Sequence, residues 1–192
     1  GSEYHDVTAH ISTDNIEASA TAAKEMAALM GETGKVAIFV HDSLSMTAKD
    51  REKGFTDELA KHTGIEVAYV YHLDEYEEMV NLITDEKNAG LTEEDENWLK
   101  AEDVSQEDVI TYILDKNPDL NGIYATNLET TQFLADVLEE MEYGDPVFIG
   151  FDGGESAFPR YQDRLILCGL PPLSGRKGKT IFAFSEVKWN SD

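Results

Sequence analysis

The feature of this sequence that most restricts its fold is a repeated alternation of short apolar runs with longer helical patterns. Four runs have the length and composition of strands, at residues 36–40, 65–71, 122–125 and 147–151, and the first is continuously apolar, as expected for a strand covered on both faces. Strands that alternate with helices of ten or more residues form right-handed βαβ units. The pattern therefore predicts a three-layer α/β fold with a parallel, doubly wound sheet of the Rossmann or flavodoxin type.

Capping signals mark where two of the helices begin. Asp14 and Glu17 have the spacing of a capping box, and so do Ser105 and Asp108. A glycine at position 31 ends the first helical pattern. We expect helices at residues 14–30, 47–62, 105–117 and 128–141.

Polar residues directly after the strands are the candidates for ligand contact. In a doubly wound parallel sheet, ligands bind beyond the carboxyl ends of the strands, near a switch in strand order. His41, Asp42 and Ser43 follow the first run, Asn127 follows the third, and Asp152 follows the fourth. We expect the remaining histidines to be structural or exposed; they are His5, His10, His62 and His72.

Charge and motifs exclude several classes of function. The formal net charge is −24, so this segment would repel a phosphate backbone and is not expected to bind nucleic acid. Cys168 is the only cysteine, which rules out an internal disulfide or a cysteine-cluster metal site. Gly-x-Ser-x-Gly, P-loop and GxGxxG motifs are missing, and no two histidines are spaced for zinc on a helix. We expect a protein that is not an enzyme and uses no cofactor or metal.

Residues 74–108 carry 14 acidic side chains against Lys87 and Lys100. Charge runs of this kind are typical of solvated helix faces or loops, which is the interpretation we favour. A calcium site is the alternative, although Asp95 and Asn97 followed by Trp98 do not match an EF-hand loop.

An ordered set of short motifs resembles a known superfamily. The motifs are TDN at residues 13–15, KVAI at 35–38, DREKGF at 50–55, PDLNGIYATN at 118–127 and IGFD at 149–152. Together they resemble the type I periplasmic binding proteins, a group that includes ribose- and galactose-binding proteins and lactose-repressor-type regulators. The resemblance covers about residues 8–154 and implies the second lobe of the periplasmic-binding-protein fold, without the first.

The resemblance implies three ligand-binding residues. The family places a ligand-binding arginine in the R-x-x-G-F motif, which is Arg51 here, and its site asparagine and aspartate match Asn127 and Asp152. A guanidinium is a planar fork of donors suited to vicinal hydroxyl groups. Structural roles stay open: Arg51 could pair with Asp50 or Glu52, while Asn127 and Asp152 could cap the segments that follow them.

The resemblance divides the chain into three parts. Residues 1–10 are interpreted as an expression scar, Gly1-Ser2, and a crossover segment; residues 11–154 form the lobe, with an acidic insertion at about 84–104. Residues 155–192 hold 4 acidic and 6 basic residues, against 35 and 9 before them, and depart from the family pattern. Suitable codons displaced by one nucleotide would restore that pattern, so we hypothesise that the chain is out of frame from about residue 158.

The implied function is non-enzymatic binding of a small sugar-like ligand by the solute-binding protein of an ABC transporter. Such a protein would be extracellular or periplasmic, lipid-anchored in its parent form, and would act with its missing first lobe and a membrane transporter or sensor. The alternative is the effector domain of a lactose-repressor-type regulator, and an enzyme on a flavodoxin-like sheet is a third class. Lys35 follows Gly34 directly, without the Gly-His-basic sequence that is common before the first strand in the regulators, which favours the transport branch. The strongly negative net charge favours it as well.

Overall fold

The computed structural model describes residues 14–144, 146–151 and 165–168. In this part of the chain, five parallel strands form one sheet in the order β2-β1-β3-β4-β5. The strands are β1 (Gly34–Val40), β2 (Ile65–His72), β3 (Gly122–Ala125), β4 (Val147–Phe151) and β5 (Leu165–Cys168). The α-helices are α1 (Asn15–Met30), α2 (Met46–Leu59), α3 (Tyr76–Lys87), α4 (Gln106–Lys116) and α5 (Leu128–Glu140).

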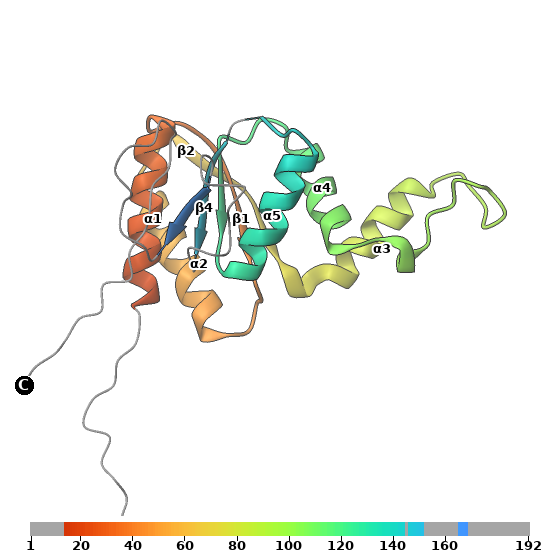
Figure 1. Ribbon diagram of the computed structural model, residues 1–192, viewed down its shortest axis with the longest axis horizontal. Helices are drawn as coiled ribbons and strands as arrows, with labels where there is room; N and C mark the ends of the chain where they lie inside the picture. The colour runs from red at the N-terminus through yellow and green to blue at the C-terminus, as the bar shows by residue number, and fades with distance from the viewer. Residues whose placement is uncertain (1–13, 145, 152–164, 169–192) are drawn as a thin grey trace, which may run out of the picture.

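Helices cover both faces of the sheet, so the predicted three-layer, doubly wound α/β fold is confirmed (Figure 1). Alternate side chains of β1 enter different apolar clusters. Val36, Ile38 and Val40 pack with α1 and α2, whereas Ala37 and Phe39 pack with α3, α4 and α5. All five side chains are fully buried, which explains why this strand reads as a continuous apolar run.

The predicted caps hold the ends of the helices. The Asp14 carboxylate accepts a hydrogen bond from the Glu17 backbone at 3.0 Å, and α1 ends at Gly31 in the left-handed region, with φ 69°. Ser105 and Asp108 form the reciprocal capping box of α4. The second helix is shorter than expected: it was predicted to reach residue 62, and α2 ends at Leu59.

The acidic stretch contains a helix that we did not place from the sequence. One face of α3 buries Met79, Val80 and Ile83, and the carboxylates of the helix are exposed. The interpretation of solvated helix faces and loops therefore describes this region correctly. In the described ranges, no group of three or more His, Cys, Asp or Glu side chains is arranged to hold a metal ion.

A close contact between α1 and α2 depends on the glycine of the R-x-x-G-F motif. A Cβ atom at Gly54 would lie 2.3 Å from the Ile16 carbonyl oxygen and 2.8 Å from its Cα. Phe55, the next residue, stacks on Tyr124 with ring centroids 4.0 Å apart. Two residues of the motif therefore pack in the core, while Arg51 lies at the carboxyl ends of the strands.

Strand β5 is part of the segment that the sequence marked as atypical. It pairs with β4 in parallel register, from Phe148 with Leu165 to Phe151 with Cys168. The rest of residues 155–192 lies outside the described residues, as does the segment at 1–10, so the out-of-frame hypothesis stays a prediction. No helix in the described ranges is long and apolar enough to cross a membrane.

Candidate functional site

The switch in strand order lies between β1 and β3. From β1 the chain continues to β2 on one side, and from β3 it continues to β4 on the other. At such a switch the loops that follow the two strands separate and leave a crevice at the carboxyl edge of the sheet. We call the residues at this switch point the carboxyl-edge site; the loop 41–45, Thr126 and Asn127 belong to it by position.

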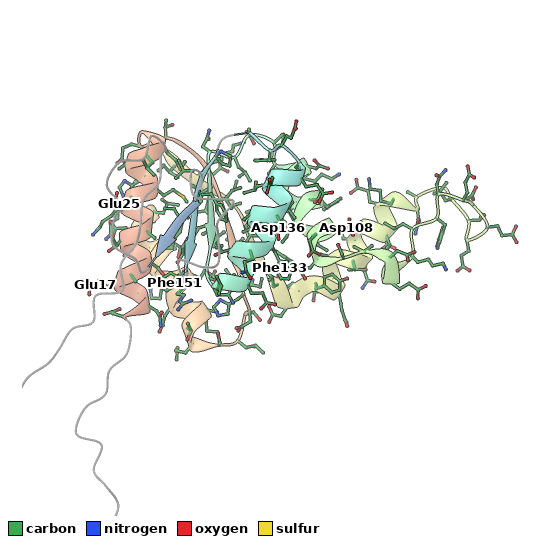
Figure 2. The ribbon with its side chains drawn as sticks, in the orientation of Figure 1. Glu17, Glu25, Asp108, Phe133, Asp136 and Phe151 are labelled. Carbon is green, nitrogen blue, oxygen red and sulfur yellow. The ribbon has the colours of Figure 1, made fainter. Side chains whose placement is uncertain are left out.

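Arg51 links three elements at this edge. It extends from α2 and is only 7% exposed. Its Nε donates to Asn15 Oδ1 at 3.0 Å and its Nη1 donates to the Thr126 carbonyl oxygen at 2.6 Å. The guanidinium carbon also lies 3.7 Å from the centre of the Phe151 ring, at the end of β4 beside α2 (Figure 2). Arg51 is therefore a fixed cation at the ends of β3 and β4.

Asn127 caps a helix, which was one of the two roles left open. Its Oδ1 accepts a hydrogen bond from the Thr130 backbone at 2.9 Å at the start of α5. Its Nδ2 makes no hydrogen bond to another described residue, and the side chain is half-buried. The cap therefore uses the oxygen, and the two amide donors have no partner among the described residues.

His41 joins the ends of β1 and β3. Its backbone N donates to Thr126 Oγ1 at 3.0 Å, and its Nδ1 lies 2.7 Å from the same oxygen. Because Oγ1 accepts from the backbone, its proton can go to Nδ1, which favours the tautomer with the proton on Nε2. Nε2 lies 3.6 Å from Asp42 Oδ2, so the ring is oriented from both sides.

Asp42 and Ser43 stabilise their own loop. Asp42 Oδ1 accepts from the backbone of Leu44 at 2.8 Å and of Ser45 at 2.5 Å, and the bond from Ser45 lowers the pKa of Asp42. Ser43 donates to Asp74 through its backbone N at 3.0 Å and its Oγ at 2.7 Å. Both side chains therefore have a structural role in the loop. This role is the alternative to direct contact with a ligand.

Three residues of this arrangement were missed from the sequence. Thr126 is buried beside His41, Asn15 fixes Arg51, and Asp74 receives the loop after β1. Burial opposes ionisation of Asp74, but the hydrogen bonds from Ser43 outweigh it and lower the pKa of Asp74. Asp74 lies two residues beyond β2, so the strand-end rule applied to that strand would have found it.

One predicted contact cannot be placed. Asp152 lies outside the described residues; in the sequence it directly follows Phe151, whose ring contacts Arg51. The described part of the carboxyl-edge site therefore supplies a cation, amide donors and an imidazole, all attached to rigid elements around the switch point.

The chain is similar to one protein family and to several solved structures. A family described as "Periplasmic binding protein domain" matches residues 2–167. No protein of curated function matches the chain significantly. An ABC transporter periplasmic solute-binding protein from Actinobacillus succinogenes with bound D-allose is 22% identical, with a TM-score of 0.55, over 77% of this chain and 43% of that one.

Two further structures are similar in the same way. An ABC transporter solute-binding protein from Burkholderia graminis in complex with D-arabinose is 21% identical, with a TM-score of 0.58, over 80% of this chain and 46% of that one. A glucose-galactose binding protein from Geobacillus stearothermophilus is 24% identical, with a TM-score of 0.55, over 78% of this chain and 44% of that one. The chain thus spans less than half the length of each of these three structures.

Proposed function

This chain belongs to the periplasmic binding protein family, and from that membership we propose that it is one lobe of a solute-binding protein for a sugar-like ligand. The ligand would lie at the carboxyl-edge site, between this lobe and a first lobe of the same protein. Two lobes of this kind close about a hinge and bury the ligand between them.

The observation that supports the proposal best is the position of Arg51. A buried guanidinium is costly unless it is paired, and here Asn15, Thr126 and the Phe151 ring hold it at the switch point of the sheet. A cation fixed in this way presents donors in a set geometry. A rigid donor at the place where doubly wound sheets bind ligands is suited to recognition.

The chemistry around Arg51 is suited to hydroxyl groups. Each sugar hydroxyl both donates and accepts a hydrogen bond, so a sugar site needs donors and acceptors close together. Asn127 offers amide donors, His41 offers an imidazole, and we propose that Asp152 adds a carboxylate acceptor. Asp42 and Ser43 would shape the loop around the ligand, with no bond made or broken.

The similar structures support the ligand class. Those from Actinobacillus succinogenes and Burkholderia graminis hold D-allose and D-arabinose, and we propose a monosaccharide for this chain as well. The remaining partners follow from the same reasoning: a membrane transporter of the ABC class, a periplasmic or extracellular location, and a lipid anchor on the parent protein.

A variant of Asn127 separates binding from helix capping. Asn127→Ser keeps an oxygen that caps α5 but removes both amide donors. In the two-lobed protein we expect its affinity for the sugar that binds to fall about tenfold, which is one lost hydrogen bond to the ligand. Calorimetry with D-allose, D-arabinose, D-glucose and D-galactose measures this. Binding of none of them would refute the proposal, and an unchanged affinity would limit Asn127 to capping.

A further inference from the structure

The segment between α3 and α4 projects from the body of the molecule (Figure 1). We call residues 84–104, from the last turn of α3 to the start of α4, the acidic arm. The arm carries eight acidic residues against Lys87 and Lys100. The carboxyl-edge site makes no use of this arm, so its chemistry needs an explanation of its own.

The arm has a defined structure. Asn88 holds its two sides together: Nδ2 donates to the Leu99 carbonyl oxygen and Oδ1 accepts from the Leu99 backbone, both at 2.8 Å. Asp95 accepts from the backbone and the hydroxyl of Thr92 at 2.7 and 2.9 Å, which closes the turn at the tip. Leu99 also packs against the main apolar cluster. These bonds fix a surface before any partner arrives, which reduces the entropy cost of binding.

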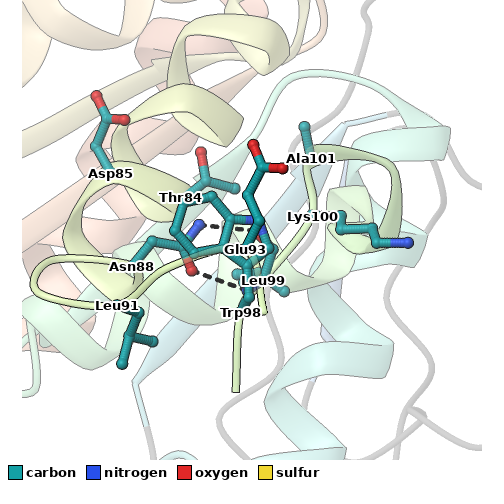
Figure 3. Close-up of a pocket in the computed structure, with 9 residues that line it drawn as sticks. All are labelled: Thr84, Asp85, Asn88, Leu91, Glu93, Trp98, Leu99, Lys100 and Ala101. Atoms are coloured by element: carbon teal, nitrogen blue, oxygen red, sulfur yellow. Dashed lines mark hydrogen bonds between the residues drawn. The ribbon is translucent and has the colours of Figure 1, made fainter. Parts of the chain in front are cut away.

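A groove of about 600 Å³ lies in this arm (Figure 3). Its apolar part consists of Leu91, Trp98, Leu99 and Ala101. The indole of Trp98 is half-buried and lines the groove together with Asn88 and Glu93. An aromatic ring of this kind binds a cation over its face with an energy that grows as water is excluded.

Three charged side chains line the groove: Asp85, Glu93 and Lys100. Asp85 and Glu93 line it, and neither forms an ion pair with another described residue. Glu86, by contrast, pairs with Lys116 at 2.5 Å, and Lys100 lies 3.7 Å from Glu102. Two unpaired carboxylates beside an indole and an aliphatic floor are complementary to the long, partly apolar side chain of lysine or arginine.

We propose that the acidic arm is a docking surface for a basic segment of a partner protein, with a lysine or arginine side chain over Trp98 and its charge toward Asp85 and Glu93. The acidic residues extend well past the groove, to Glu94 and Glu96 at the tip. A small organic cation would contact only the groove, whereas a chain with several basic residues uses the whole length. This inference does not depend on the proposed ligand function.

A labelled peptide tests the proposal on the 192-residue chain. The probe is fluorescein-labelled Gly-Arg-Gly-Lys-Gly-Arg-Gly-Lys, followed by anisotropy at about 50 and 200 mM NaCl, since salt screens such contacts. We expect Trp98→Leu, and separately Asp85→Asn with Glu93→Gln, to weaken binding about 3- to 10-fold. Glu139→Gln with Glu140→Gln removes the same charge from the exposed end of α5 and should change it less than about twofold.

The outcomes are distinct. Equal losses in the arm variant and the α5 control would mean diffuse attraction to an acidic protein and would overturn the proposal, as would no binding of the peptide. Spermine that binds with the same dependence on Trp98, while the peptide does not bind, would assign the groove to a small cation instead. The carboxylate variants alter exposed side chains only, so they give an answer even if Trp98→Leu fails to fold.

Discussion

Replacement of Arg51 by methionine tests whether this residue holds the carboxyl edge of the sheet together. Arg51→Met keeps most of the length and apolar stem of the side chain but removes its donors. The Thr126 carbonyl then loses the 2.6 Å bond in a buried position, and Asn15 Oδ1 loses its bond at a half-buried one. The stacking of the guanidinium on Phe151 is lost as well.

The expected loss of stability follows from these contacts. An acceptor left without a donor costs about 1–3 kcal/mol, toward the upper end at Thr126 and the lower end at Asn15, which water can reach. Removal of a buried charge returns part of this cost. We expect the free energy of unfolding to fall by about 2–4 kcal/mol, which lowers the urea midpoint by about 1 M.

Two further variants make this prediction sharp. Arg51→Lys keeps the charge but can satisfy only one of the two acceptors, so its midpoint should lie between those of wild type and Arg51→Met. Lys53→Met, on the exposed side of the same helix, removes only a surface pair with Asp57 and should leave the midpoint nearly unchanged. A loss below about 0.5 kcal/mol for Arg51→Met would refute the reasoning.

Three other predictions concern the core and the pH dependence of stability. Tyr124→Phe leaves Ser19 Oγ without its 2.9 Å partner and should lower the free energy of unfolding by about 1–2 kcal/mol. The same substitution should cost less in a Ser19→Ala background, and additive losses of the two substitutions in urea denaturation would contradict this. Gly54→Ala forces a Cβ into the backbone of α1 and should cost about 1–3 kcal/mol by the same assay; an unchanged midpoint would mean that the helices can separate freely. Burial lowers the pKa of His72, but two neighbouring glutamates outweigh it and raise the pKa above 6.5, so this stabilisation is complete below 6.5 and is lost as the pH rises through the folded-state pKa. The stability difference between wild type and His72→Gln should therefore shrink from pH 6 to pH 8, and a constant difference would contradict the assignment.

The sequence was sufficient for the centre of the sheet because β1, β3 and β4 are buried on both faces. Val36, Ile38 and Val40 face one helical layer and Ala37 and Phe39 the other, so the run carries no polar residue to obscure it. Local capping rules likewise placed α1 and α4. Helix α3 was harder, since its three buried residues are outnumbered by the carboxylates of its solvent face.

The site was harder to predict because its hydrogen bonds join residues far apart in the chain. Thr126 is 85 residues from His41, and Arg51 is 75 residues from the carbonyl oxygen it binds. Strand-end position selected His41 and Asn127 as candidates, but it does not say which of their atoms already bond to neighbouring residues. Asn127 caps a helix with its oxygen and keeps its amide donors, a division that only the local geometry reveals.

The most direct test of the proposal that this chain is a sugar-binding lobe is an NMR titration of the ¹⁵N-labelled chain with D-allose, D-arabinose, D-glucose and D-galactose. A single lobe makes only part of the contacts of a closed protein, so we expect weak binding, with shifts confined to the amides of residues 41–45 and 126–128 and to the Arg51 side chain. Shifts concentrated elsewhere, or none with any of the sugars, would contradict the proposed site. Sub-micromolar affinity for the isolated chain would contradict the single-lobe proposal.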